Sequence, residues 1–185
     1  MKTNKISIMN DMNKLVTERL VLRKLKREDA ESMFNNWCKD PEVAKYTTWT
    51  AHENVEVTKA LVNMWVEEEK SGANRFVITL KGNDEPIGMI DVVDYYDGIP
   101  EIGYCLSRKH WNKGYMSEAC KAFVNYLFEL GYPKIFISAD ERNIGSNRVI
   151  EKCGFTFTHK EKLEMHSKEK PESVIVNKYE IKKPE

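Results

Sequence analysis

The sequence predicts a mixed α/β (α+β) fold, with one twisted, mostly antiparallel sheet of about seven strands and about four helices. Three observations lead to this prediction. The chain has 185 residues, which is a usual size for one domain. Its apolar patterns give the order β-α-α-β-β-β-α-β-α-β-β. Most of these strands follow one another as hairpins, and one strand–helix–strand crossover adds a parallel pair.

The N-terminal half is expected to hold two helices between two strands. Residues 1–13 are polar and predict a flexible tail, so a single domain is expected at residues 14–185. Asp29 favours a helix start, because a carboxylate stabilises the positive end of the helix dipole. Thr50 and Glu53 fit a capping box before the second helix. The expected elements are a strand at 19–23, a helix at about 29–38 that Asp40-Pro41 ends, a helix after Thr50 to about Lys70, and a strand at 75–80.

Turn and cap signals divide the C-terminal half. Asp97-Gly98 is a hairpin signal between two strands. Gly131 ends a long amphipathic helix, and Gly154 is expected to cap a shorter helix in the left-handed conformation. The expected elements are strands at 87–95, 101–106, 134–139, 155–165 and 174–181, with helices at 115–130 and 143–153 and with Pro171 between the last two strands.

Composition disfavours several classes of function. The chain has 29 basic and 29 acidic residues, and this zero net charge argues against a nucleic-acid partner. Four cysteines form no CxxC pair and four histidines lack the spacing of metal ligands, so no metal is expected. The N-terminus lacks the apolar segment of a signal peptide, and no apolar run has the length of a membrane span. We therefore expect a cytoplasmic protein with no membrane partner.

The segment Trp111–Ala119 carries the strongest signal for ligand binding. It joins an apolar strand pattern to the amphipathic helix and has Gly114 at its centre. The first N–H groups of a helix have no intrahelical partner, and the helix dipole favours negative charge there. A glycine also lets an anion approach the backbone closely. The loop predicts a phosphorylated ligand, although a glycine used only for turn geometry is the alternative. Neither a P-loop nor a G-x-G-x-x-G fingerprint is present.

Five short motifs occur along the chain between about Thr17 and Ile181. They are Glu18-Arg19-Leu20-Val21-Leu22-Arg23, Asp40-Pro41-Glu42-Val43, Glu101-Ile102-Gly103-Tyr104, Trp111-Asn112-Lys113-Gly114-Tyr115, and Asn143 to Phe155 in the pattern N-x-x-S-x-R-x-x-E-K-x-G-F. Together they resemble the RimJ/RimL-type branch of the GNAT superfamily, whose members are acetyl-CoA-dependent N-acetyltransferases. The order of the motifs matches the order of the expected elements.

The resemblance implies a GNAT-like sheet that is splayed between its fourth and fifth strands, at Glu101–Ser107 and Lys134–Ala139, with acetyl-CoA in the cleft. The pantetheine arm would pair with the backbone of Cys105, Leu106 and Ser107. The pyrophosphate would lie on the loop residues Asn112, Lys113, Gly114, Tyr115, Met116 and Ser117. Met116 stands where the family commonly has Gly or Ala, so we expect weakened binding at most. Asn143 would bind the pantetheine amides or cap its helix.

Amide formation needs a base for the amine and a group that assists the leaving thiolate. Glu101 is the first candidate base, with Asp91 and Asp94 in reserve, and an exposed Glu101 at a strand start is the alternative. Many GNAT enzymes use a Tyr as the acid, but Ile150 occupies that position. The branch uses the Ser of its last motif, which corresponds to Ser146. That serine would act as a relay or would bond its own backbone. A backbone N–H near Tyr104 or Cys105 would polarise the carbonyl.

We therefore expect an N-acetyltransferase that uses acetyl-CoA as co-substrate. The acceptor is expected to be a primary amine, either a protein N-terminus or a small molecule, that attacks directly in a ternary complex. The alternative is a non-catalytic acyl-CoA-binding or sensor module. The sequence leaves open whether the protein is a monomer or a homodimer.

Overall fold

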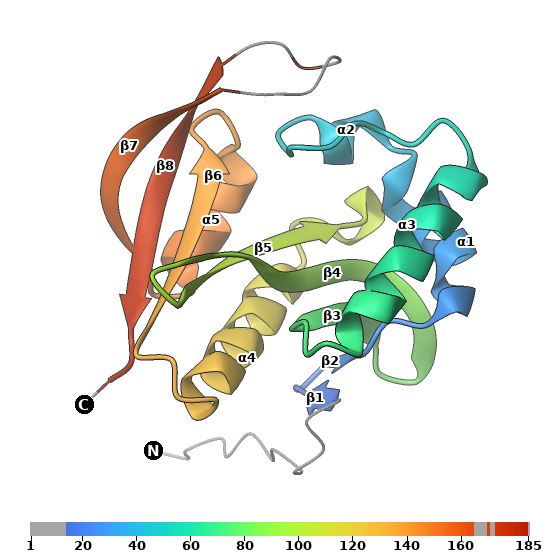
Figure 1. The fold of residues 1–185 in the computed structure, drawn as a ribbon, viewed down its shortest axis with the longest axis horizontal. Coiled ribbons are helices and arrows are strands. Elements are labelled where there is room, and N and C mark those ends of the chain that lie inside the picture. Colours follow the sequence, from blue (N-terminus) through green and yellow to red (C-terminus); the bar gives the residue numbers. More distant parts are fainter. Residues whose placement is uncertain (1–13, 165–169, 171–172, 185) are drawn as a thin grey trace.

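A single mixed sheet runs through the protein in the computed structural model, which describes residues 14–164, 170 and 173–184. The sheet has eight strands in the order β1-β2-β3-β4-β5-β6-β8-β7 (Figure 1). Only the β5–β6 pair is parallel, and the other pairs are antiparallel. The expected tail at 1–13, the strand end at Met165 and the position of Pro171 lie outside the described residues.

The expected order of strands and α-helices is confirmed, with one additional strand and one additional short α-helix. The strands are β1 (Lys14–Val16), β2 (Leu20–Arg23), β3 (Arg75–Leu80), β4 (Asn83–Tyr96), β5 (Ile99–Leu106), β6 (Lys134–Asp140), β7 (Thr156–Glu164) and β8 (Ser173–Lys182). The α-helices are α1 (Ala30–Met33), α2 (Pro41–Ala44), α3 (Val55–Glu69), α4 (Tyr115–Glu129) and α5 (Ile144–Lys152). Strand β1 and helix α2 are the additions, and both are too short to give a periodic signal. The helix expected at about 29–38 is divided into a 3-10 segment (Arg27–Asp29), α1 and a π segment (Phe34–Cys38), and a further 3-10 turn lies at Arg108–His110.

Helices cover both faces of the sheet (Figure 1). Helix α4 packs on one face, where Phe123 meets Phe76 edge-on at a centroid distance of 5.8 Å. On the opposite face, Met33 and Val62 from α1 and α3 pack against Val77. Successive residues of β3 thus point into different cores, as the alternation of a strand requires.

The two halves of the sheet separate between β5 and β6 (Figure 1). These strands pair only at Glu101 with Phe136 and at Ile102 with Ile137. Strand β5 continues to Leu106 and remains paired with β4 there. The expected splay between these two strands is therefore confirmed, and it leaves one edge of β5 open.

One expectation about a helix end is wrong, and another is incomplete. Helix α3 starts at Val55, and its N-cap is Asn54, whose side chain accepts from the N–H groups of Glu56 and Val57 at 3.0 and 3.3 Å. The Thr50–Glu53 pair is not the cap, because Asn54 lies next to the first turn and is among the best capping residues. Asp40-Pro41 also does more than end a helix, since Asp40 caps α2 and Pro41 opens it.

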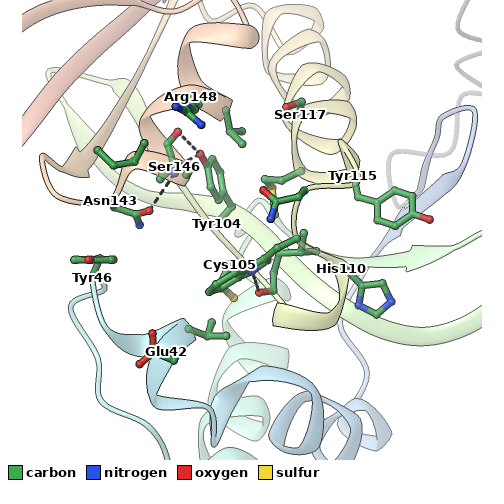
Figure 2. Close-up of a pocket in the computed structure, with 18 of the residues that line it drawn as sticks. Glu42, Tyr46, Tyr104, Cys105, His110, Tyr115, Ser117, Asn143, Ser146 and Arg148 are labelled. Carbon is green, nitrogen blue, oxygen red and sulfur yellow. Dashed lines mark hydrogen bonds between the residues drawn. The ribbon is translucent and has the colours of Figure 1, made fainter.

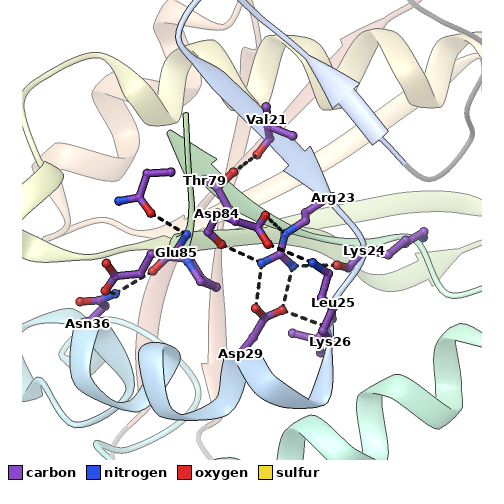
Figure 3. Close-up of polar contacts among 12 residues, drawn as sticks. Val21, Arg23, Lys24, Leu25, Lys26, Asp29, Asn36, Thr79, Asp84 and Glu85 are labelled. Carbon is purple, nitrogen blue, oxygen red and sulfur yellow. Dashed lines mark hydrogen bonds and ion pairs between the residues drawn. The ribbon is translucent and has the colours of Figure 1, made fainter. Parts of the chain in front are cut away.

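The second arginine of the first motif, Arg23, has a structural role (Figure 3). Its guanidinium donates to both carboxylate oxygens of Asp29 at 2.8 Å and to the side chain of Asp84 at 2.5 Å. Arg23 and Asp29 are both buried. Such a bidentate pair fixes geometry as well as adding energy. It joins β2 to the start of the first helix and to the start of β4.

Candidate active site

Two adjoining cavities lie where β5 and β6 separate. The first, of about 600 Å³, is lined by α2 and the segment after it, the end of β5, the start of α4, and α5. The second, of about 860 Å³, is lined by the segment after α2, by β4, β5 and β6, and by β8. The residues common to both are Lys45, Tyr46, Thr47, Tyr104, Cys105, Arg142, Asn143 and Ser146. A ligand in the first cavity can therefore meet a ligand in the second.

The loop before α4 turns at Gly114, as predicted. Gly114 has φ +78° and is the N-cap of α4, and Asn112 also has a positive φ of +59°. The left-handed conformation is easily available to glycine, while asparagine tolerates it better than most residues. The indole N–H of Trp111 donates to the carbonyl of Leu106 at 2.8 Å, which ties the loop to β5. Tyr115, Met116 and Ser117 of the first turn of α4 line the first cavity, and Figure 2 shows Ser117 on this helix beside the cavity.

Arg19 and Glu118 brace this loop from the edge of the sheet. The carboxylate of Glu118 accepts from the Thr17 hydroxyl at 2.6 Å and from Nε of Arg19 at 2.7 Å. Arg19 also donates to the carbonyl of Lys113 at 2.9 Å, and its guanidinium lies 4.6 Å from the ring centroid of Tyr115. Burial opposes ionisation of Glu118, but the hydrogen bonds from Thr17 and Arg19 outweigh it and lower the pKa of this carboxyl. Arg19 of the first motif thus stabilises the loop that contains the fourth motif. The sequence alone does not indicate this contact.

Eight of the ten residues predicted to bind the cofactor line the first cavity. They are Cys105, Leu106, Asn112, Gly114, Tyr115, Met116, Ser117 and Asn143. Of the other two, Ser107 is buried and its N–H donates to Ile87 of β4, and the carbonyl of Lys113 accepts from Arg19. The side chain of Met116 packs in the core beneath α4. The extra volume of Met116, compared with the Gly or Ala that is common in the family, therefore lies mainly in the core.

The open edge of β5 presents backbone groups to the first cavity. The N–H of Ser107 points to β4, so alternation turns the N–H groups of Tyr104 and Leu106 to the other side. Strand β6 no longer pairs with β5 at these positions. An extended chain such as pantetheine fits an edge of this kind.

Positive charge predominates around the first cavity. Lys45, Arg142, Arg148 and Lys152 line it, with Glu42 as the single carboxylate among its described lining residues. Within the part of the chain that the structure describes, no carboxylate forms an ion pair with Arg148 or Lys152. A cavity lined by one sign of charge attracts ligands of the other sign. This cavity is suited to a polyanion.

Glu101 lies in the second cavity and is only 5% exposed, which excludes the alternative of a solvated side chain at a strand start. Its Oε1 accepts from the hydroxyl of Ser138 at 2.7 Å and from Nζ of Lys178 at 3.1 Å. The ammonium of Lys178 offsets the charge of the buried carboxylate. A sequence pattern does not reveal such a partner, because Lys178 is 77 residues away.

The two reserve carboxylates also line the second cavity, but they differ in their surroundings. Asp91 is buried and forms an ion pair with Arg75 at 3.1 Å. Burial raises the pKa of Asp91, and the Arg75 guanidinium opposes this rise. Asp94 is exposed and accepts from the N–H of Tyr95 at 2.7 Å. Of these three described carboxylates, Glu101 is therefore the one that is buried and is not paired with an arginine.

Asn143 and Ser146 lie at the start of α5, beside the boundary of the two cavities (Figure 2). The side-chain oxygen of Asn143 accepts from the N–H of Ser146 at 3.1 Å, so Asn143 caps the helix. The hydroxyl of Ser146 lies 3.0 Å from the phenol oxygen of Tyr104. Sequence reasoning did not single out this side chain, although the alternation of β5 puts Tyr104 on the same face as Ile102 and Leu106.

Comparisons with known proteins agree with this geometry. The family described as an acetyltransferase (GNAT) domain matches residues 19–156. The chain belongs to this family. The N-acetyltransferase p20 of Bacillus licheniformis, described as uncharacterized, is 37% identical over 148 residues, which cover 78% of this chain and 83% of p20. The GNAT assignment made from the five motifs is thus confirmed, and the protein is an acyltransferase by family.

Solved GNAT structures share the fold. An acetyltransferase of Bacillus anthracis has a TM-score of 0.78 at 29% identity, covering 91% of this chain and 98% of that chain. RimL, a ribosomal L7/L12 α-N-protein acetyltransferase in complex with coenzyme A, has a TM-score of 0.76 at 18% identity, covering 90% of this chain and 96% of that chain. The likeness to RimL concerns the fold.

No helix at 14–164 or 173–184 is long and apolar enough to cross a membrane. No group of three or more His, Cys, Asp or Glu side chains within these ranges is arranged to hold a metal ion.

Proposed function

We propose that this GNAT protein transfers the acetyl group of acetyl-CoA to a primary amine in a ternary complex. Acetyl-CoA would occupy the first cavity and the amine the second. The observation that carries this proposal is the meeting of the two cavities at Tyr104 and Ser146, with Glu101 buried on the acceptor side. A module that only bound acyl-CoA would have no need of a second cavity that holds a buried carboxylate.

The donor side is supported by three features of the first cavity. The turn at Gly114 leaves N–H groups of the first turn of α4 for the pyrophosphate. The open edge of β5 suits the pantetheine amides. The cations Arg148 and Lys152, which form no ion pair with a described carboxylate, suit the remaining phosphate of coenzyme A.

The acceptor side is supported by the surroundings of Glu101. A primary amine is largely protonated near neutral pH and must lose a proton before it attacks. The carboxylate of Glu101 would take that proton, directly or through water, while Ser138 and Lys178 hold it in place. The acceptor would be a protein N-terminus or a small amine. RimL, which shares the fold, is named for the first of these.

Three further expectations belong to the proposal. The described residues would form part of one GNAT domain at 14–185. All four cysteines are free, which supports a reducing, cytoplasmic location. The likeness of the motifs to the RimJ/RimL-type branch is supported by RimL among the structural neighbours.

The proposal is tested by acetyl transfer itself. The protein is incubated with acetyl-CoA and a panel of acceptors that contains peptides with free N-termini, a polyamine and an aminoglycoside. Release of free thiol and a mass increase of one acetyl group in one acceptor class is the expected result. Tight binding of acetyl-CoA without transfer to any member of the panel would favour the sensor module instead.

A further inference from the structure

The phenol of Tyr104 lies within hydrogen-bond distance of Ser146 at the boundary of the two cavities. The phenol oxygen lies 3.0 Å from the Ser146 hydroxyl and 3.2 Å from the Ser146 backbone carbonyl (Figure 2). Both residues line both cavities. Under the proposed function, the acetyl thioester must reach this boundary, because the donor is in one cavity and the acceptor in the other.

The hydrogen atoms of this contact have two possible arrangements. A carbonyl oxygen only accepts, so the phenol donates either to the carbonyl or to the hydroxyl of Ser146. When the phenol donates to the carbonyl, the serine O–H turns toward the phenol oxygen. When the phenol donates to the serine hydroxyl, the serine O–H is free to point into the cavity. Negative charge that develops in the cavity favours the second arrangement.

We propose that Tyr104 is a positioning residue that holds the Ser146 hydroxyl as a hydrogen-bond donor to the leaving sulfur of coenzyme A. The inference rests on the proposed function. In the step, the amine nitrogen bonds to the acetyl carbon, the C–S bond breaks, and its electron pair goes to sulfur. The amine gives its first proton to Glu101 before it attacks, and the second proton leaves the nitrogen for water as the amide forms. The thiolate is stabilised by the Ser146 O–H and takes its proton from water afterwards.

The surroundings of Tyr104 fit a donor that keeps its proton. Burial raises the pKa of this phenol well above its ordinary value. A phenol of this kind is a poor acid toward a thiolate but a stable hydrogen-bond donor at every physiological pH. The position where many relatives have their acid holds Ile150, which is fully buried. The Tyr104–Ser146 pair therefore supplies a hydroxyl hydrogen-bond donor at the boundary of the two cavities, where the sulfur of coenzyme A must lie.

The test uses coenzyme A with its free thiol and needs no acceptor. The bound thiol is titrated with pH, and its thiolate is followed by ultraviolet absorbance, with desulfo-coenzyme A as the background. We expect the bound thiol to ionise about one pH unit below the free thiol, a tenfold stabilisation of the thiolate. Tyr104→Phe and Ser146→Ala should each remove most of this shift while coenzyme A still binds. The Ser146→Ala variant decides the matter if Tyr104→Phe does not fold.

Two control variants separate this role from a structural one. Tyr126→Phe removes a phenol on α4 that donates to Asn74 at 3.0 Å and lines neither cavity, so the shift should persist. Tyr46→Phe removes a phenol on the opposite wall of the boundary. If only Tyr46→Phe abolished the shift, the donor would lie on that wall and the assignment to Tyr104 would be overturned.

Turnover gives a second readout once an acceptor is found. Tyr104→Phe should lower kcat about tenfold with KM for acetyl-CoA little changed, and the double variant with Ser146→Ala should be no slower than Ser146→Ala alone. A bound thiol that ionises as in free solution would overturn the inference and leave the proposed function intact. Failure of coenzyme A to bind at all would overturn both.

Discussion

Nε of Arg19 lies 2.7 Å from a carboxylate oxygen of Glu118, and this contact joins the chain before β2 to the first turn of α4. The same guanidinium holds the carbonyl of Lys113, inside the loop that turns at Gly114. Arg19 of the first motif therefore stabilises the candidate phosphate loop. Arg19 lies outside the lining of either cavity.

Replacing this arginine should loosen the loop without touching the ligand. Arg19→Lys keeps the charge but loses the fork that reaches Glu118 and Lys113 together. We expect the Kd for acetyl-CoA to rise about three- to tenfold, since one or two hydrogen bonds are lost. Calorimetric titration measures this directly. The matched control is Arg27→Lys, which affects an ion pair with Glu67 at a similar exposure, 48% against 44% for Arg19. An equal loss of affinity in the control would contradict the account.

The carboxyl of Glu118 should make stability depend on pH in the acid range. Its pKa in the folded protein is lowered from the ordinary value of 4.5 by hydrogen bonds from Thr17 and Arg19, which outweigh burial. A lowered pKa stabilises the fold above the ordinary value, and the stabilisation is lost as pH falls through the folded value. Thermal unfolding of the wild type and of Glu118→Gln should differ at neutral pH, and the difference should shrink as pH falls from 4.5 through the lowered pKa of the folded protein. A constant difference down to pH 3 would exclude this role for Glu118.

Removing the candidate base should affect turnover rather than donor binding. Glu101→Gln is expected to lower kcat about 100-fold or more and to leave the Kd for acetyl-CoA within about twofold. The single variant also removes the nearer of two carboxylates from the half-buried Lys178 and leaves only Glu161 at 3.6 Å among its described partners, which destabilises the protein. The double variant Glu101→Gln/Lys178→Met removes both charges and should recover stability but not activity. Unaltered turnover in Glu101→Gln would remove Glu101 from the mechanism and point to Asp94 or Asp91.

The turn at Gly114 offers a prediction with a close internal control. Gly114 has φ +78°, and an added Cβ would lie 3.4 Å from the Arg19 guanidinium. Gly98 has a nearly equal φ of +76°, but a Cβ there would meet nothing within 4 Å. Both Gly→Ala variants should lose about 1 to 2 kcal/mol of stability, because an L residue is strained in this conformation. Only Gly114→Ala should weaken acetyl-CoA binding. A similar loss of affinity in Gly98→Ala would show that strain alone, and not the loop, lowers affinity.

Local signals in the sequence predict much of this structure. Gly114 and Gly154 occur where a left-handed residue is needed, and both have positive φ. The Asp97-Gly98 pair forms the β4–β5 turn. These signals act over a few residues, so they can be read from the order of the chain. The start of α3 is different, because Thr50 and Asn54 are both suitable N-cap residues. The backbone conformation in the folded chain determines which of them is used.

Long-range partners account for what the sequence does not predict. Glu101 is held by Lys178 of β8, and Ser146 of α5 meets Tyr104 of β5. Each pair is joined across the splayed sheet, and no periodicity encodes which polar side chains meet there. The candidate site residues follow from the family motifs, whereas their hydrogen-bond partners follow only from the fold.

The most direct test of the central claim is a calorimetric titration with acetyl-CoA, compared with S-acetyl-pantetheine, which lacks the phosphates. The account predicts micromolar binding of acetyl-CoA and a large loss of affinity for the compound without phosphates, because the turn at Gly114 and the cations of α5 hold the phosphates. No binding of acetyl-CoA at millimolar concentration would contradict the account, and so would equal affinity for the two compounds.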